Sequence, residues 1–168
     1  MRSGYIAPED FKRLAVRLQP ANLLSLRIAM QTGLRIDDVL SLRIEKLKIR
    51  LTVTEKKTGN KRRVYIGKKL LKDIFAFVGR RSKGFVFSHR LDPKRHRSRQ
   101  AVFKDVKKQA EALGLHSQIS PHTFRKVYAV KLYHRTKDLA TVQRILGHKK
   151  METTLIYALA DALADVIK

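Results

Sequence analysis

The sequence predicts a mainly helical domain with one small antiparallel β-hairpin, which places it in the α+β class. Most apolar residues recur at the three- and four-residue spacing of helices, and Pro, Gly and acidic residues stand where such helices begin and end. One stretch, Lys46–Val53, instead alternates apolar and polar residues, which is typical of a half-buried strand. The expected order is therefore helices, hairpin, helices.

Three helices are predicted before the hairpin. The first begins at Pro8, which acidic residues follow in the first turn, and Pro20 ends it. The second covers Leu23–Gln31, and Gly33 follows it at the place where a left-handed backbone closes a helix. A short third helix begins at the acidic pair 37–38.

The hairpin turn is predicted at Lys57–Asn60 and the return strand at Arg63–Ile66, so that the tip is strongly basic. Ser98 and Asp138 are the expected N-caps of two later helices. The remaining expected elements, in order, are a helix over Leu70–Val78, a short buried element over Phe85–Phe87, a basic loop over Arg90–Arg99, and helices over Gln100–Leu113, 122–134, 138–147 and 153–167.

Charge is the strongest signal in the composition. The chain has 168 residues, with 38 Lys and Arg against 14 Asp and Glu, a formal net charge of +24. An excess of this size repels itself unless the partner is a polyanion, and phosphate contacts supply most non-specific affinity for nucleic acid. We therefore expect nucleic acid as the partner. A membrane surface is the weaker candidate, because no basic run is paired with an exposed amphipathic anchor.

Length and residue content bound the class of protein further. We expect residues 1–168 to form a single domain, without an internal repeat or linker. The absence of Cys excludes a disulfide framework and a thiolate metal site. The N-terminus lacks the apolar core of a signal peptide, and no apolar run approaches the length of a membrane span. We therefore expect a cytoplasmic, DNA-associated protein with no membrane contact.

The acidic residues limit the phosphate chemistry that is open to the chain. A metal-dependent nuclease needs clustered carboxylates, and the close pair 37–38 is adjacent in a helix, where neighbours do not face each other. The six His lack zinc-protease spacing, and there is no glycine-rich triphosphate loop. The sequence predicts no metal and no small-molecule cofactor. Phosphate chemistry would then need cationic side chains and a side-chain nucleophile.

Several residues suit such chemistry. Arg125 lies one turn after His122, so that both project from the same helix face. Arginine binds two phosphate oxygens at once. Arg35 follows a helix-ending glycine, His148 follows Gly147, and Lys57 is at the hairpin tip. The candidate set is Arg35, Lys57, His122, Arg125, His148 and Tyr157.

Each candidate also has a plainer interpretation. Most of the 38 basic residues are expected to be solvated surface, and Tyr157 lies among apolar residues that suit a core tyrosine. The residues alone thus indicate a basic, helical protein that binds DNA or RNA and is suited to metal-free phosphoryl transfer. They leave the nucleophile open among Tyr5, Tyr65, Tyr128, Tyr133 and Tyr157.

Four separated blocks of the sequence form an ordered pattern: Thr32–Leu42, Lys57–Gly59, Pro121–Arg125 and, last, Leu146–His148 with Thr153, Thr154 and Tyr157. In this order they resemble the catalytic domain of the tyrosine recombinase (phage integrase) family. The family usually has Ser-Glu where this chain has Asp37-Asp38. The resemblance covers nearly the whole chain and implies a tyrosine recombinase catalytic-domain-like fold.

The resemblance implies a role for each candidate. Tyr157 is similar to the nucleophile that attacks a scissile DNA phosphate, leaving a 3′-phosphotyrosine and a free 5′-hydroxyl. Arg35 and Arg125 would hold the non-bridging oxygens. Lys57 would be the general acid for the leaving 5′-oxygen, although Lys56 and Lys61 share the hairpin.

The two histidines complete the implied site. His122 would assist proton transfer to and from the tyrosine, and His148 would hydrogen-bond the phosphate. Asp38 would orient neighbouring groups. Lys126 and Val127 stand where the family often has His and then Ser or Thr, which changes the surroundings of the site without removing a catalytic group.

The implied function is site-specific DNA recombination of the integrase type, as in mobile genetic elements, without metal or ATP. The implied partner is double-stranded DNA, with self-assembly on it as a tetramer. The family's N-terminal core-binding domain is expected to be absent from residues 1–168, and the tail after Tyr157 packs either in cis or on a neighbouring subunit. Two alternatives stay open: a type IB topoisomerase or telomere resolvase, and a non-catalytic DNA-binding protein derived from an integrase.

Overall fold

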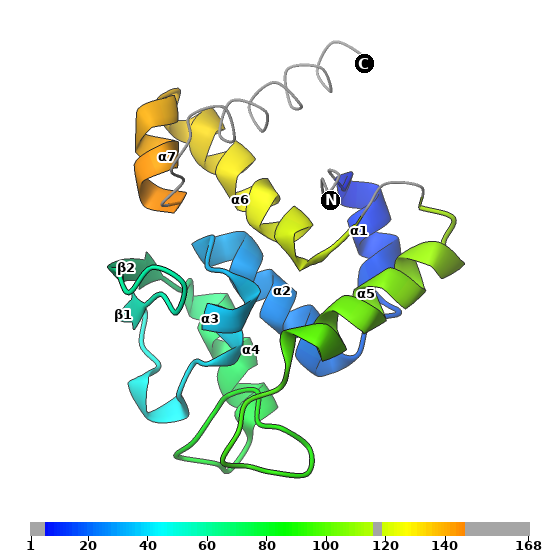
Figure 1. The fold of residues 1–168 in the computed structure, drawn as a ribbon, viewed down its shortest axis with the longest axis vertical. Helices are drawn as coiled ribbons and strands as arrows, with labels where there is room; N and C mark the ends of the chain where they lie inside the picture. The colour runs from blue at the N-terminus through cyan, green and yellow to red at the C-terminus, as the bar shows by residue number, and fades with distance from the viewer. Residues whose placement is uncertain (1–5, 116–118, 147–168) are drawn as a thin grey trace.

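The computed structural model describes residues 6–115 and 119–146, and over these ranges it is mainly helical with a two-stranded antiparallel sheet, as predicted. Figure 1 shows α2 in the middle of the molecule, with the hairpin on one side and α1 and α5 on the other. The elements are α1 (Pro8–Ala15), α2 (Pro20–Thr32), α3 (Ile36–Leu40), the 3-10 turn η1 (Ile44–Lys46), β1 (Arg50–Thr54), β2 (Lys61–Tyr65), α4 (Lys68–Val78), α5 (Arg99–Ala112), α6 (Pro121–Thr136) and α7 (Leu139–Leu146).

The central helix α2 organises the core. It packs against α6 and also contacts α3, α4 and β2. Leu26 and Ile28 of this helix have no exposed surface. Burial of such a side chain contributes about 1.5–3 kcal/mol. Because α2 is buried along most of its length, its position in the core is fixed, and its C-terminal end supports the candidate site.

A specific residue accounts for the position of each end of α2. The sequence predicts that Pro20 ends the first helix, but α1 ends at Ala15 and Pro20 is the first residue of α2. Proline suits that place because the first N–H groups of a helix have no helical acceptor. At the other end Gly33 adopts φ 64°, and an added Cβ would lie 2.3 Å from the ring of Tyr128. Glycine is therefore required there by both conformation and space.

The hairpin pairs in the register Arg50↔Tyr65 to Thr54↔Lys61, and its buried face carries Leu51, Val53 and Val64. The predicted strand over Lys46–Val53 begins four residues late, at Arg50. The preceding backbone instead pairs with a distant segment: Ile44 N–H donates to the Gly84 carbonyl, and Val86 N–H donates to the Leu42 carbonyl. This pairing also explains the short buried element predicted at Phe85–Phe87.

The helices of the second half begin at side-chain caps. Ser98 accepts a hydrogen bond from the Ala101 N–H, and Asp138 accepts from the N–H groups of Ala140 and Thr141, as predicted. Ser120 forms a capping box at the start of α6. The predicted last helix, 153–167, lies outside the described residues. Across residues 6–115 and 119–146, no helix combines the length and apolarity needed to cross a bilayer.

Candidate active site

The end of α2, the start of α3, the hairpin turn and the start of α6 meet at one place. Arg35 is the N-cap of α3, Lys57 lies in the hairpin turn, and His122 and Arg125 lie in the first turns of α6. Partial burial lowers the pKa of His122, and the charges of Arg125, Arg35 and Lys57 lower it further. The four candidates within the described ranges therefore form one cluster.

The other two candidates, His148 and Tyr157, lie outside the described residues. The last residue described before them is tied to the cluster, because Nη2 of Arg125 donates to the carbonyl of Leu146 at 2.5 Å. Leu146 ends α7 and precedes His148 by two positions in the sequence. The contact links the His122–Arg125 block to the segment that leads into the last block of the family pattern.

Arg125 is a buried cation with an unused donor. Its residue is 5% exposed, and within the described part of the chain its Nη1 has no hydrogen-bond partner. Burial lowers its pKa to about 10, and the nearby charges of Arg35 and Arg62 act in the same direction. The guanidinium therefore remains protonated at neutral pH. A charged group with a buried, unsatisfied N–H is suited to an anionic ligand.

Arg35 is held by a carboxylate. Its Nη1 donates to Oε2 of Glu55 at 2.6 Å, and Glu55 is 3% exposed. Burial raises the pKa of Glu55, but hydrogen bonds from Arg35 and Thr58 and the charges of Arg35 and Arg125 outweigh burial, so the pKa lies below its usual value. Glu55 is therefore ionised at neutral pH and neutralises part of the arginine cluster.

The turn that carries Lys57 is docked by a second carboxylate. Oδ1 of the buried Asp38 accepts a hydrogen bond from the Lys56 N–H at 2.9 Å. Burial raises the pKa of Asp38, opposed by that hydrogen bond. The side chain of Lys56 contacts Nε2 of His96 at 2.7 Å, whereas the charge of Lys57 acts on His122. These placements favour Lys57 over Lys56 as the lysine of the site.

Glu55 belongs to the site but not to the residues predicted for it, although the sequence carries one signal for it. In β1 the buried positions Leu51 and Val53 alternate with exposed ones, and Glu55 continues the buried series. A carboxylate at an inward position of a strand is costly unless it has cationic partners. Such a break in the pattern therefore indicates a buried ion pair, and here the partner is the first candidate arginine.

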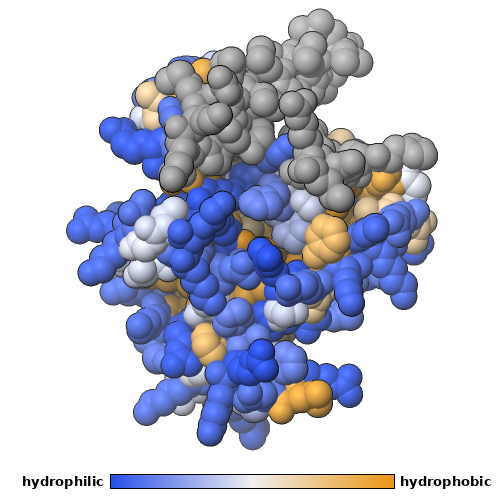
Figure 2. All heavy atoms as spheres, in the orientation of Figure 1, coloured by the Kyte–Doolittle hydropathy of each residue, from blue (hydrophilic) through white to orange (hydrophobic). Residues whose placement is uncertain are grey.

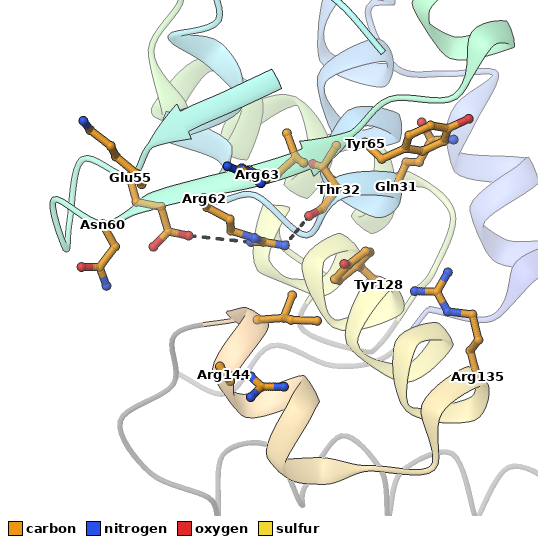
Figure 3. A pocket seen from close by; sticks show the side chains of 13 residues that line it. Gln31, Thr32, Glu55, Asn60, Arg62, Arg63, Tyr65, Tyr128, Arg135 and Arg144 are labelled. Atoms are coloured by element: carbon orange, nitrogen blue, oxygen red, sulfur yellow. Dashed lines mark hydrogen bonds and ion pairs between the residues drawn. The ribbon is translucent and has the colours of Figure 1, made fainter. Parts of the chain in front are cut away.

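Arg62 joins the hairpin to the end of α2. Its guanidinium donates to the carbonyls of Thr32 and Gly33, which the helix leaves without partners, and lies 3.7 Å from Oε1 of Glu55. Figure 3 shows Arg62 between Glu55 and Thr32, above Tyr128 of α6. Arg62 thereby places β2 against the same helix end that positions Arg35.

A cavity of about 660 Å³ lies beside the cluster, between β2, α6 and α7 (Figure 3). Glu55 and Arg62 line it, together with Arg135 and Arg144. Its lining does not include the four candidates in the described ranges, so the cavity borders the cluster and does not contain it. Among the described residues, no group of three or more His, Cys, Asp or Glu is placed to hold a metal ion.

Comparison with known proteins decides the family. The sequence model of the phage integrase family matches residues 6–163. This chain belongs to the phage integrase family. It is similar to the probable integrase/recombinase YoeC of Bacillus subtilis, with 32% identity over 130 residues, which cover 76% of this chain and 71% of that protein. It is also 32% identical, over 133 residues, to the tyrosine recombinase XerA of Pyrococcus furiosus, covering 75% of this chain and 46% of that protein.

Solved structures support the fold assignment. The crystal structure of XerA recombinase matches 92% of this chain and 58% of its own chain, with a TM-score of 0.72 and 18% identity. A lambda integrase dimer bound to a COC′ core site matches 94% of this chain and 48% of its own, with a TM-score of 0.71 and 19% identity. The chain thus spans about half the length of most relatives that it matches. The predicted family and fold are confirmed, and the roles of individual residues stay predictions.

Proposed function

We propose that this chain cuts and rejoins double-stranded DNA as a site-specific tyrosine recombinase, through a 3′-phosphotyrosine at Tyr157. Family membership and the net charge of +24 support the proposal. Among the coloured residues of the face in Figure 2, hydrophilic side chains predominate, as suits contact with a polyanion. Similar structures include XerH site-specific recombinase bound to its difH substrate, and the Tn1549 transposon integrase in complex with a circular intermediate DNA.

One observation carries the proposal: within the described residues, Nη1 of Arg125, beside Arg35, has no hydrogen-bond partner. A buried donor without an acceptor costs about 1–3 kcal/mol. A non-bridging oxygen of a DNA phosphate would remove that cost. Two guanidinium groups at one phosphate would also stabilise the negative charge that grows as the phosphorus becomes pentacoordinate. Binding of a phosphate would therefore account for an arginine that is incompletely hydrogen-bonded in the free protein.

The proton transfers of the cleavage step are assigned to His122 and Lys57. The hydroxyl oxygen of Tyr157 forms a bond to phosphorus as the bond from phosphorus to the 5′-oxygen breaks. His122, whose lowered pKa leaves it neutral at neutral pH, accepts the tyrosine proton, and Lys57 gives a proton to the leaving oxygen. The phosphodiester energy is kept in the protein link, so that a 5′-hydroxyl can reverse the reaction on the same or another strand without ATP.

The proposal also covers the oligomeric state, the cellular location and the biological role of the protein. We propose that the chain works in the cytoplasm as a tetramer assembled on DNA, and that it serves a mobile genetic element. His148, which follows the Arg125–Leu146 contact by two positions, would hydrogen-bond the same phosphate.

Trapping of the covalent intermediate tests the proposal. The protein is incubated, with EDTA present, with nicked duplexes drawn from the DNA around its gene, and the mixture is run on a denaturing gel. The expected result is a protein–DNA band that Tyr157→Phe abolishes and that the matched control Tyr65→Phe retains. A band that persists in Tyr157→Phe, or that appears only with magnesium, would contradict the proposal. Relaxation of supercoiled plasmids without any special site would indicate a topoisomerase instead.

A further inference from the structure

Glu55 connects two parts of the site through a single atom. Its Oε2 accepts a hydrogen bond from Nη1 of Arg35 at 2.6 Å and another from Oγ1 of Thr58 at 3.0 Å. Thr58 is the residue after Lys57 in the hairpin turn. The arginine expected at the phosphate and the turn of the expected general acid are therefore both placed relative to one carboxylate oxygen.

The remaining contacts of this region make the connection rigid. Asp38 of α3 holds the backbone of Lys56 from the other direction, at 2.9 Å. The Glu55 N–H and carbonyl pair with Asn60 and Gly59 across the turn. Glu55 therefore cannot shift without moving the turn, and the turn cannot shift without moving Arg35.

We propose that Glu55 is a positioning residue that sets Arg35 and the Lys57 turn in fixed relation, so that both meet the same phosphate. The proposal rests on the recombinase function proposed above. Glu55 itself does not touch the reacting atoms. It acts by fixing the plane of the Arg35 guanidinium, which leaves the other N–H groups for phosphate oxygens, and by fixing the turn from which Lys57 reaches the leaving 5′-oxygen.

A plainer role for Glu55 is to neutralise the buried cations around it. Charge alone would be supplied by any carboxylate in this region, and Asp38 already adds one. The two roles differ in what they need. Neutralisation tolerates a small displacement of the carboxylate, whereas positioning does not, because a misplacement of about 1 Å in a catalytic group can lower a rate about 100-fold.

Glu55→Asp separates the two roles, because it keeps the charge and withdraws the carboxylate by one methylene, about 1.5 Å. The first-order rate of covalent complex formation is measured at saturating protein on two DNA substrates. One is ordinary DNA, and the other has sulfur in place of the bridging 5′-oxygen. A thiolate leaves without a proton, so the second substrate does not need the general acid.

Glu55→Asp is expected to slow cleavage of ordinary DNA about 100-fold and to show a clearly smaller deficit on the sulfur substrate. The deficit does not vanish, because Arg35 is displaced as well. Thr58→Val removes only the link from Glu55 to the turn. It should slow cleavage of ordinary DNA less than Glu55→Asp does, and it should cleave the sulfur substrate at the wild-type rate. Glu9→Asp, the same change at an exposed position of α1, is the matched control and should leave both rates unchanged.

Two results would overturn the proposal: Glu55→Asp cleaves ordinary DNA at the wild-type rate, or its deficit is equal on the two substrates. If Glu55→Asp does not fold, as judged by thermal unfolding, Thr58→Val decides alone, and a wild-type rate for it on ordinary DNA refutes the role of Glu55. Failure of the underlying function looks different, since the wild-type protein itself would then form no covalent complex with either substrate.

Discussion

The two arginines of the site are held in opposite ways. On the hairpin side, Arg35 donates to a carboxylate at 2.6 Å, and the pair is reinforced by Thr58 and Arg62. On the α6 side, Arg125 donates to a backbone carbonyl, and its Nη1 has no partner within residues 6–115 and 119–146. Burial and neighbouring cations lower its pKa to about 10. Among the described residues, the guanidinium of Arg35 has a carboxylate partner in direct contact, and that of Arg125 has none.

The difference indicates that the two arginines contribute differently to the stability of the free protein and to ligand binding. The Arg35–Glu55 pair contributes to the folded structure before any ligand arrives. Arg125 is buried beside two other arginines, and within the described residues its Nη1 has no hydrogen-bond partner, so its charge is the less stabilised of the two in the free protein. Proteins keep such destabilised groups where a ligand completes them. In the proposed reaction, the α6 side is therefore the part of the site that most needs the DNA phosphate.

The largest expected effect is a difference in stability between two matched variants. Arg35→Met leaves Glu55 charged and buried without its main partner, and should lower the free energy of unfolding by about 3 kcal/mol. Arg125→Met removes a buried, repelled charge and replaces it with an apolar side chain of similar length. Its loss should be distinctly smaller. Denaturant unfolding of the two variants without DNA measures the contrast.

The cleavage activities of the two Met variants should not differ in the way that their stabilities do. Both Met variants are expected to lose at least about 100-fold in cleavage, because in the proposed reaction each arginine is a charged donor to the transition state. A stable Arg125→Met protein without activity would sharpen the contrast between the two sides. An Arg125→Met variant that is less stable than Arg35→Met would break it, and would mean that Arg125 is satisfied in the free protein.

A smaller effect concerns His122, which lies at the start of α6. Its pKa lies below the usual value of 6.5, so the unfolded chain takes up a proton at a higher pH than the folded chain does. Stability should therefore fall as the pH drops from about 6.5 through the lowered pKa, and His122→Asn should reduce this loss. His134→Asn, at the other end of the same helix, is the matched control.

An NMR titration of the His122 ring proton checks the cause directly. A midpoint below 6.5 is expected in the free protein, because partial burial and the charges of Arg125, Arg35 and Lys57 disfavour the protonated ring. Bound DNA phosphate should raise the midpoint, since it adds negative charge beside the same ring. A midpoint at or above 6.5 without DNA would show that the α6 side is not a cationic, underpaired site.

The helices were readable from sequence because their signals are local. Ser98 and Asp138 cap the helices that their positions indicate, and Gly33 closes α2 as expected. Pro20 was misassigned because proline suits both the residue after one helix and the first residue of the next. Residues 44–46 form a 3-10 turn before β1, and the pairing of Ile44 with Gly84, about forty positions away, gives no local signal in the sequence.

The site could be predicted only in part, because some of its contacts join residues that are far apart in the sequence. Arg125 and His122 share a helix face, which spacing alone indicates. The link from Glu55 to Arg35 spans 20 positions and two elements, and the predicted strand, which ends at Val53, does not reach Glu55. Neither the unsatisfied Nη1 of Arg125 nor its bond to Leu146 has a counterpart in the sequence. The tertiary arrangement supplies them.

The most direct test of the central claim is to identify the residue that becomes joined to DNA. The covalent complex formed in EDTA is digested with protease and nuclease, and the peptide that retains a nucleotide is sequenced by mass spectrometry. The account predicts a nucleotide linked by its 3′-phosphate to Tyr157. A link to another tyrosine, such as Tyr65 on the hairpin or Tyr128 beside Gly33, or a link through a 5′-phosphate, would contradict it.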